Sequence, residues 1–402
     1  MKKILSGKTL LALPKRNFLT AFSIEKNLSI HVKNLLKNTG RLKKINMNYN
    51  FMLSNPNKTD VLLIDENYSN LKFKNLKSFI FDYKIIYLKI FIRSIIEYLF
   101  KNKNKNKIKE IYLSILLQKL SPRIIIGHHL NPLIFKIKKY SPKSKIIVYL
   151  HHRLYLSQIH DLRKISDDAS IDYFFVCDEL HKKFLKKYFS GKFIANGLVK
   201  NNEIKLDNTK PKFDVAYISE YRAHNYPKKK IHFKFIKEIA EYLGEYSVKY
   251  KKKIVIALNS TRTDKKILPQ EEINYFKKIS PNFIFLNKKD SYKVCNLAKL
   301  VVCLNSNLGA DFLAREKKVL FLPFLYKYDD SFKNPYFKKN FFYVVKKNNK
   351  KIIYNKLNYL LNLNDLFWKK KLKKSKIKII FNKNNSILKK EISKITKIKN
   401  LL

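Results

Sequence analysis

The chain has 402 residues, of which 46% are hydrophobic and 14% aromatic, so it can bury the cores of about two domains and is not a disordered protein. Its formal net charge is +56, but only nine of the 86 cationic residues are Arg, the side chain that phosphate and base recognition favours. We therefore predict solvated Lys side chains on every exposed face and no nucleic-acid partner.

The first half of the chain alternates short β-branched or aromatic runs with helical patterns, which is typical of βαβ units and a parallel sheet. Strands are predicted at Thr9–Leu13, Asp60–Ile64, Arg123–Gly127, Lys145–Leu150, Tyr173–Cys177 and Lys192–Ala195. Helices are predicted at Ile24–Lys37, Tyr83–Phe100, Ile108–Leu120, Pro132–Lys139 and Leu180–Tyr188.

One apolar segment, Ser78–Phe100, raises the question of a membrane span. Charged residues interrupt it, and each of them is costly at the centre of a bilayer. They are Asp82, Lys84, Lys89, Arg93 and Glu97. The pattern favours an amphipathic helix that packs on the protein or lies at an interface.

The segment Asn201–Pro211 combines polar residues with a Pro and has no periodic pattern, which predicts a boundary between domains at 1–205 and 212–350. Strands of the second domain are predicted at Asp214–Ile218, Lys253–Leu258, Phe283–Leu286, Leu300–Leu304 and Lys318–Leu322. Helices are predicted at Ile231–Tyr250, Pro269–Ile279, Ser291–Ala298 and Leu308–Arg315. Residues 351–402 form a basic helical tail, which we expect to pack partly back across the domains, with Trp368 as an anchor, and to fray after about Lys390.

Two series of this kind predict an α/β protein with two Rossmann-like, doubly wound domains. Because open parallel sheets bind ligands at the carboxyl ends of their strands, the two domains are expected to face a central cleft.

The strongest local signal is Val301–Glu316, a predicted buried strand followed by a helix. Ser306 and Asn307 offer an N-cap, and the free backbone N–H groups of Asn307, Leu308 and Gly309 would suit a nucleotide diphosphate. Gly309 would let the ligand approach the backbone, and Asp311 could accept hydrogen bonds from ribose hydroxyls. An ordinary capped turn without a ligand explains the same pattern equally well.

Several segments in consistent order resemble a bacterial family of surface carbohydrate biosynthesis proteins, which are glycosyltransferase-like proteins of the GT-B type. The matching segments are NSNLGADFLAREKKVLFLP (305–323), Ile124–His152, Asp172–Gly197 and AYISEYR (Ala216–Arg222). The sequence departs from the family where Asp311 replaces a Glu and where His151-His152-Arg153 replaces Gln-Asn-Gly.

This resemblance implies a GT-B-like fold and a transferase that takes an activated sugar from a nucleotide-sugar donor to a glycan or lipid-linked glycan acceptor. An inverting reaction needs a general base, and four His residues follow two neighbouring predicted strands. His152 is the first candidate because related polyol-phosphate transferases carry a His after the equivalent strand, and His129 is the second. His128 and His151 complete the group.

The donor phosphates would be held in the second domain, where polar residues follow two predicted strands. These are Ser219, Arg222, Asn259 and Arg262, with Ser260 and Thr261 beside them. Arg222 stands at the family's Arg, whereas Arg262 could equally be a solvated loop residue.

No Asp-x-Asp triplet follows a predicted strand, so a metal site is not predicted, and no cofactor beyond the donor is expected. A Walker loop and a dinucleotide-binding Gly motif are also missing from the sequence, which disfavours kinases and dehydrogenases. The leading interpretation is a glycosyltransferase of surface polysaccharide or lipopolysaccharide biosynthesis. Its alternatives are a CDP-polyol phosphotransferase of the same architecture and a non-catalytic sugar-nucleotide-binding assembly protein.

Three widely spaced Cys residues in apolar runs, Cys177, Cys295 and Cys303, predict buried thiols in a reducing compartment. The N-terminal segment does not have the pattern of a signal peptide. We therefore expect a cytoplasmic protein, whose positive charge would also favour peripheral contact with anionic lipid at the inner face of the membrane.

Overall fold

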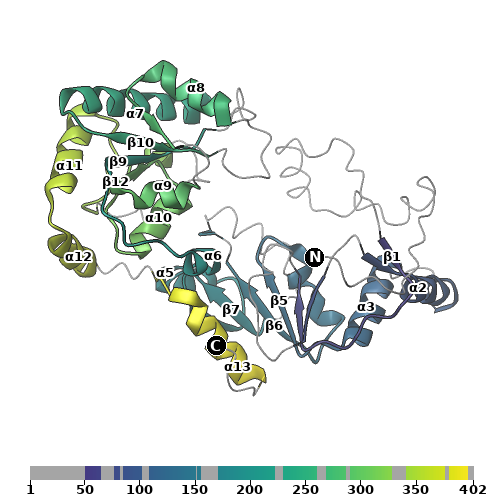
Figure 1. Cartoon of the computed structure of the whole chain (residues 1–402). Helices are drawn as coiled ribbons and strands as arrows, with labels where there is room; N and C mark the ends of the chain where they lie inside the picture. Colours follow the sequence, from purple (N-terminus) through teal and green to yellow (C-terminus); the bar gives the residue numbers. More distant parts are fainter. Residues whose placement is uncertain are drawn as a thin grey trace.

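The computed structural model describes residues 50–64, 77–81, 85–101, 108–150, 152–154, 171–221, 230–259, 269–286, 290–327, 341–375 and 380–396. Two large parallel sheets, one from each half of the chain, organise these residues (Figure 1). This confirms the predicted fold class, an α/β protein with two doubly wound sheets. The strand predicted at Thr9–Leu13 and the helix predicted at Ile24–Lys37 lie outside the described residues.

The first sheet has six strands in the order β3-β2-β5-β6-β7-β8, and all of its neighbouring strands are parallel. The strands are β2 (Val61–Leu63), β3 (Ser78–Ile80), β5 (Ile124–His128), β6 (Lys145–Tyr149), β7 (Tyr173–Val176) and β8 (Lys192–Ala195). Each strand predicted within this region is present, and β3 was not predicted.

A separate pair of short parallel strands, β1 (Asn50–Met52) and β4 (Ile85–Tyr87), lies at the edge of the first domain. Helix α2 (Leu88–Lys101) follows β4 directly, so the predicted helix Tyr83–Phe100 begins too early. The β-branched pair Ile85-Ile86 supports strand pairing better than a first helical turn. Helix α3 (Ile108–Leu120) has its predicted bounds.

The two faces of the first sheet are covered by different parts of the chain. Ile125, Val148 and Phe174 point to one face, where they pack with α3 and α5 (Glu179–Leu185). Because side chains alternate along a strand, Ile147 and Phe175 point to the other face, where the C-terminal segment packs. Two short 3₁₀ turns, η3 (Pro132–Phe135) and η4 (Ile137–Lys139), replace the α-helix predicted at Pro132–Lys139.

The second sheet has five parallel strands in the order β11-β10-β9-β12-β13. They are β9 (Phe213–Ile218), β10 (Ile254–Ala257), β11 (Ile284–Phe285), β12 (Ala298–Cys303) and β13 (Val319–Phe321). The surrounding helices are α7 (Lys230–Lys249), α8 (Pro269–Ile279), α9 (Ser291–Asn296) and α10 (Asn307–Ala314). All of these elements lie where they were predicted, within a few residues.

The link between the two sheets is shorter than predicted, because a helix occupies its beginning. Helix α6 (Val199–Glu203) includes Asn201 and Asn202, and both of these side chains are buried. The described chain then runs without helix or strand from Ile204 to Lys212 before β9 begins.

The C-terminal helices cross from the second domain back to the first. Helices α11 (Lys350–Asn362) and α12 (Asp365–Lys374) pack on the second sheet, where Trp368 is 1% exposed and its Nε1 donates to the Glu316 carbonyl at 2.9 Å. Helix α13 (Ser386–Thr396) lies instead against the first sheet (Figure 1). Its Leu388 and Ile392 are fully buried, so the predicted fraying after about Lys390 is wrong.

Four Asn side chains fix this returning segment by hydrogen bonds. Asn382 Nδ2 donates to Asn196 Oδ1 at 2.8 Å, and Asn202 Nδ2 donates to Asn385 Oδ1 at 2.8 Å. Asn202 Oδ1 also accepts from the Asn382 backbone N–H at 2.9 Å. These side-chain amides are buried away from water, so their hydrogen bonds to one another supply partners for donors and acceptors that would otherwise have none.

The three Cys residues are free and buried, as predicted. Burial raises the pKa of each thiol above its ordinary value, so they are poor nucleophiles at neutral pH.

Candidate functional site

The strand order of the second sheet reverses between β9 and β12, which is the position where doubly wound sheets bind ligands. Ser219 and Glu220 follow β9, and Asn305 and Ser306 follow β12. The Asn305 backbone N–H donates to Glu220 Oε1 at 2.9 Å and so ties the two strand ends together. Sequence reasoning identified Ser219 and Ser306 here and missed Glu220.

Helix α10 begins at this reversal point. Its N-cap is Ser306, whose Oγ accepts a hydrogen bond from the Leu308 N–H at 3.2 Å, as predicted from the sequence. Ser306, Asn307 and Leu308 are all partly exposed. The first turn therefore offers backbone N–H groups and the positive end of the helix dipole to an anion.

Gly309 has a packing role that the sequence did not indicate. A Cβ built at this position would lie 2.4 Å from Cys303 Sγ and 3.1 Å from Phe321 Cε1. The missing side chain therefore lets α10 approach the sheet, while the predicted ligand approach at this Gly stays a prediction.

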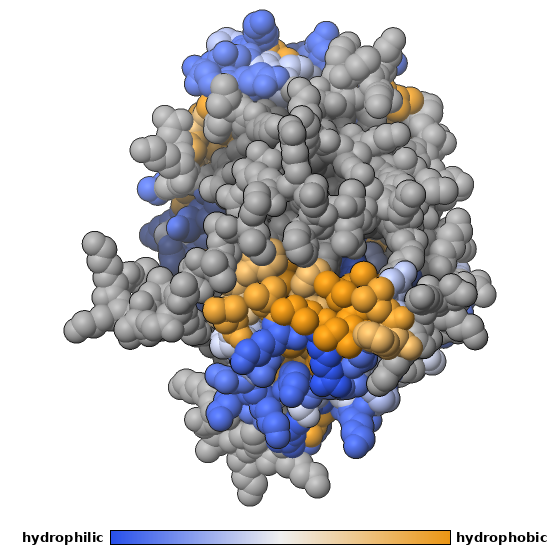
Figure 2. All heavy atoms as spheres, turned by 90° about the vertical axis from the view of Figure 1, so that its right-hand side faces the viewer, coloured by the Kyte–Doolittle hydropathy of each residue, from blue (hydrophilic) through white to orange (hydrophobic). Residues whose placement is uncertain are grey.

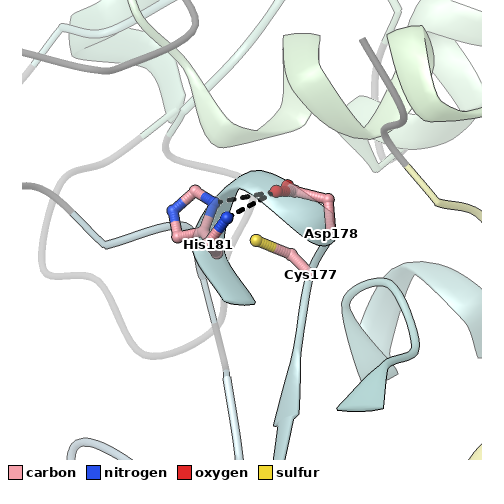
Figure 3. A group of neighbouring side chains, drawn as sticks. All are labelled: Cys177, Asp178 and His181. Carbon is pink, nitrogen blue, oxygen red and sulfur yellow. Dashed lines mark hydrogen bonds and ion pairs between the residues drawn. The ribbon is translucent and has the colours of Figure 1, made fainter. Parts of the chain in front are cut away.

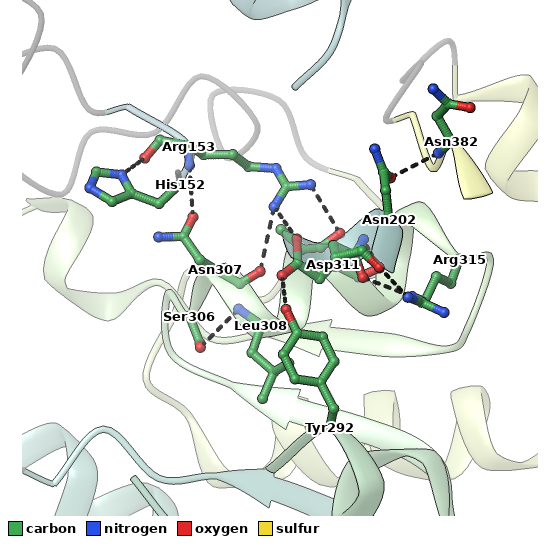
Figure 4. A network of polar contacts seen from close by, with 12 residues as sticks. His152, Arg153, Asn202, Tyr292, Ser306, Asn307, Leu308, Asp311, Arg315 and Asn382 are labelled. Atoms are coloured by element: carbon green, nitrogen blue, oxygen red, sulfur yellow. Dashed lines mark hydrogen bonds and ion pairs between the residues drawn. The ribbon is translucent and has the colours of Figure 1, made fainter. Parts of the chain in front are cut away.

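A buried ion pair joins the two domains at α10. Arg153 follows β6 of the first domain, and its Nη1 donates to Asp311 Oδ1 at 3.0 Å (Figure 4). The side chains of Arg153 and Asp311 are 1% and 6% exposed. Nη2 of the same guanidinium donates to the Ala310 carbonyl at 3.3 Å, and the Arg153 backbone N–H donates to Asn307 Oδ1 at 3.3 Å.

The second carboxylate oxygen of Asp311 is also engaged, since Tyr292 Oη donates to Oδ2 at 2.6 Å. Burial raises the pKa of Asp311, and Arg153 and Tyr292 oppose that effect by favouring the ionised form. The structure thus gives Asp311 a set of protein partners, while its predicted contact with ribose stays a prediction.

A second contact between the domains lies one helical turn further along α10. Arg315 Nε donates to Asn201 Oδ1 at 2.8 Å, and its Nη2 donates to the carbonyl oxygens of Asn201 and Ile204. The guanidinium also stacks on Phe381, 4.1 Å from the ring centroid. Arg153 from the first domain and Arg315 at the C-terminal end of α10 therefore fix this helix against the first domain, and the sequence did not identify either role.

The predicted His group gathers at the carboxyl ends of the neighbouring strands β5 and β6 of the first sheet. His129 is 1% exposed, His152 is partly exposed, and their ring centroids lie 4.7 Å apart. His128 lies beside them, 6.3 Å from His129 between ring centroids. The sequence thus placed these three side chains together correctly, whereas His151 lies outside the described residues.

A backbone contact sets the tautomer of His152. Its Nδ1 lies 3.0 Å from the carbonyl oxygen of Arg153, which can only accept, so the hydrogen is assigned to Nδ1 and the lone pair to Nε2. Burial lowers the pKa of His152, which keeps the ring neutral at pH 7. Because Arg153 also touches Asn307, His152 belongs to the same junction as the first turn of α10 (Figure 4).

Three side chains of kinds that bind metals meet at the end of β7: Cys177, Asp178 and His181 (Figure 3). Asp178 caps α5, and its Oδ1 accepts from the His181 backbone N–H at 2.8 Å. His181 Nδ1 lies 3.3 Å from Asp178 Oδ1, and its Nε2 lies 3.3 Å from the Leu154 carbonyl oxygen. Burial opposes ionisation of Asp178, but contacts with His181 outweigh it and lower the pKa of the carboxyl. These bonds give Asp178 and His181 a capping role, and Cys177 packs in the first-domain core.

The other predicted donor residues lie at the end of β10 or outside the described residues. Asn259 Nδ2 donates to the Tyr221 carbonyl at 2.8 Å, and its backbone N–H donates to the buried Glu272. This places Asn259 beside Ser219 at neighbouring strand ends. Arg222 and Arg262 fall outside the described residues, so their part in the site stays a prediction.

A family model described as "putative O-antigen biosynthesis protein" matches residues 153–396, more than half of the chain. The chain belongs to this family. Family membership confirms the resemblance to surface carbohydrate biosynthesis proteins that the sequence motifs indicated. No curated protein matches the sequence.

Solved structures share the fold of this member of the O-antigen biosynthesis family. A "putative UDP-N-acetylglucosamine 2-epimerase" from Listeria monocytogenes superposes with a TM-score of 0.51 at 12% identity, over 85% of this chain and 98% of that chain. A second UDP-N-acetylglucosamine 2-epimerase gives 0.51 at 11% identity, over 86% and 98%. TarM gives 0.43 at 16% identity, over 73% and 59%. At these identities the first two matches show the two-domain fold alone.

Proposed function

We propose that this O-antigen family member is a glycosyltransferase that moves a sugar from a nucleotide-sugar donor to a glycan or lipid-linked glycan acceptor. The proposal rests on the contact between the two domains that Arg153 makes with Asn307 and Asp311, which we call the junction. The first turn of α10, at the reversal point of the second sheet, lies across from His152, at the end of a first-domain strand. An anion site on one domain and a neutral His on the other are the two groups that sugar transfer requires.

The donor diphosphate would be bound by the first turn of α10, with Ser219, Asn259 and Arg222 as further contacts. Ser306 keeps the turn in its capped conformation, and the helix dipole stabilises the charge that develops on the leaving diphosphate. Asp311 would act through its bond to Arg153, which fixes α10 relative to the first domain.

The first domain would supply the base. His152 Nε2 would take the proton of the acceptor hydroxyl while that oxygen bonds to the anomeric carbon and the bond from this carbon to the diphosphate oxygen breaks. His129 is nearly fully buried and lies against the His152 ring, so it would orient His152 and would not itself touch the acceptor. Transfer without a metal ion is part of the proposal, since the helix dipole and cationic side chains would stabilise the leaving group.

The test begins with binding of UDP, GDP, CDP and ADP, measured by calorimetry on the wild-type chain and on Asn307→Asp. The added carboxylate lies beside the anion site and should repel a diphosphate. The matched control is Asn348→Asp, at an exposed position of the second domain. Equal binding by both variants would place the nucleotide elsewhere and overturn the proposed donor site.

Product analysis then separates the alternative functions. A glycosyltransferase releases a nucleoside diphosphate only when an acceptor is present, whereas a CDP-polyol phosphotransferase releases CMP. An epimerase converts the donor without any acceptor, and a non-catalytic binding protein does neither. Turnover that survives removal of divalent cations by EDTA would support the metal-independent mechanism, and loss that added Mg²⁺ or Mn²⁺ restores would overturn it.

A further inference from the structure

Helix α2 carries apolar side chains on two opposite faces. Its inner face packs into the first-domain core through Ile90, Phe91 and the fully buried Ser94. Its outer face also carries large apolar side chains, which no helix or strand of the described residues covers. These are Ile92, Ile96, Leu99 and Phe100, which are 49%, 49%, 51% and 82% exposed.

These four residues, the outer face of α2, lie together on the helix surface. Positions 92, 96, 99 and 100 share one side of the helix because they are spaced three and four residues apart. Figure 2 views the molecule from the side of β1, α2 and α3 and shows a hydrophobic band with hydrophilic residues along its lower edge. Leu53, which follows β1 and is 43% exposed, belongs to the same edge of the domain.

Single exposed apolar residues are ordinary, but a contiguous group of this kind marks a contact surface. The inner face already provides what folding requires of α2, because it packs against α3 and the core. The outer face therefore has to be explained by contact with a partner.

The charged residues around the outer face of α2 indicate which kind of partner it contacts. Lys89 and Arg93 are exposed on α2 beside its outer face, where Arg93 also pairs with Glu97 of the same helix at 2.9 Å. Lys109 and Lys119 are exposed on the neighbouring α3. The whole chain has a formal net charge of +56, so a second copy of it would be repelled. An anionic lipid surface, in contrast, attracts the cations and accepts the apolar side chains.

The dimensions of α2 fit a helix that lies on a bilayer. Its 14 residues span about 21 Å, which is shorter than the roughly 30 Å hydrocarbon core. Among the helices that the structure describes, none is long and apolar enough to cross a membrane. We propose that the outer face of α2 docks the first domain on an anionic lipid bilayer, with Phe100 and Ile96 inserted below the headgroups. This proposal needs neither nucleotide nor turnover and so stands apart from the proposed function.

Vesicle flotation with the full chain tests the docking surface. The probes are vesicles of phosphatidylcholine alone and vesicles with about one third phosphatidylglycerol, an amount that gives a strongly anionic surface. Ile96→Glu/Phe100→Glu should weaken binding to the anionic vesicles by at least about tenfold, because it removes apolar insertion and adds like charge. The matched control is Leu366→Glu/Phe367→Glu, at two equally exposed apolar residues of α12, which should bind like the wild type.

A second measurement does not depend on a charge change. In Phe100→Trp, the new indole should shift its emission to shorter wavelength when anionic vesicles are added, over the constant emission of the buried Trp368. Wild-type binding to both vesicle types alike, or none at all, would overturn the proposal. So would unchanged binding of the α2 double variant, or an emission spectrum of Phe100→Trp that anionic vesicles leave unshifted. A wild-type dimer by light scattering that the double variant converts to monomer would assign the surface to a second copy instead.

Discussion

Replacing Arg153 by Met would remove the charge that compensates Asp311 inside the domain junction. The Asp311 side chain is 6% exposed and would keep only the Tyr292 hydroxyl as a side-chain donor. Breaking a buried ion pair from one side costs about 3–5 kcal/mol, because the remaining charge stays buried without compensation. We expect Arg153→Met to lower the free energy of unfolding by that amount, measured by urea denaturation at pH 7.

The pH dependence of the variant provides an independent check. The pKa of Asp311 is already raised above its ordinary 3.8 by burial, and loss of Arg153 raises it further. A folded state that binds the proton more tightly than the unfolded state loses stability as the pH rises through the folded pKa. Arg153→Met should therefore regain stability relative to the wild type as the pH is lowered, as Asp311 becomes neutral.

An exposed ion pair of the same domain serves as the control. Lys139 and Glu110 lie 3.3 Å apart with side chains 53% and 36% exposed, so Lys139→Met should cost less than about 1 kcal/mol. The double variant Arg153→Met/Asp311→Asn carries no buried charge and should cost clearly less than the sum of its single variants. If Arg153→Met costs no more than Lys139→Met, the ion pair does not stabilise the junction.

Three further changes test other parts of the molecule. Gly309→Ala should cost about 1–3 kcal/mol, since its Cβ would meet Cys303 Sγ, and an unchanged urea midpoint would contradict the packing role. His152→Gln should lower turnover about 10²- to 10⁴-fold without weakening nucleotide binding. Because burial lowers the pKa of His152 below its ordinary value of 6.5, the kcat/KM of the wild type should fall only when the pH is lowered below 6.5. If the activity that remains in His152→Gln falls over the same pH range, a group other than His152 is responsible. Deleting residues 380–402 should expose the face under Leu388 and Ile392 and reduce soluble yield, whereas deleting only 397–402 should not.

The elements that could be predicted from sequence are those whose pattern is local. The β-branched triplets 124–126 and 254–256 are buried on both faces of their sheets, and this composition gives a clear strand signal. The short strands β1, β3 and β4 include exposed or partly buried residues, unlike the equally short and fully buried β2 and β13, so their signal is weaker. Their pairing depends on neighbours far along the chain, which a single window of sequence does not contain.

The residues of the candidate site likewise divide into those that a local sequence pattern predicts and those that it does not. Ser306 and the His group follow predicted strands, so the rule that ligands bind at the carboxyl ends of strands located them. Arg153 and Asp311 are separated by 158 positions, and no local pattern joins them. One signal was available in the composition, because the chain has 86 cationic residues and only nine of them are Arg. An Arg in such a chain is a candidate for a position where one planar guanidinium donates hydrogen bonds to several acceptors. Arg153 and Arg315 both do this.

The position of α13 sets the order in which the two domains can be completed. The first sheet has all of its described strands once residue 195 has been made, but the face formed by Ile126, Ile147 and Phe175 is covered by residues 386–396. During synthesis the second domain can close on its own helices while that face of the first sheet still lacks its covering helix. A ribosome must add about 190 more residues before this apolar surface is covered, which at roughly 5–20 residues per second takes on the order of 10 to 40 seconds. The first domain to be translated is thus the last to be finished, and its unfinished face is where chaperones would act during synthesis.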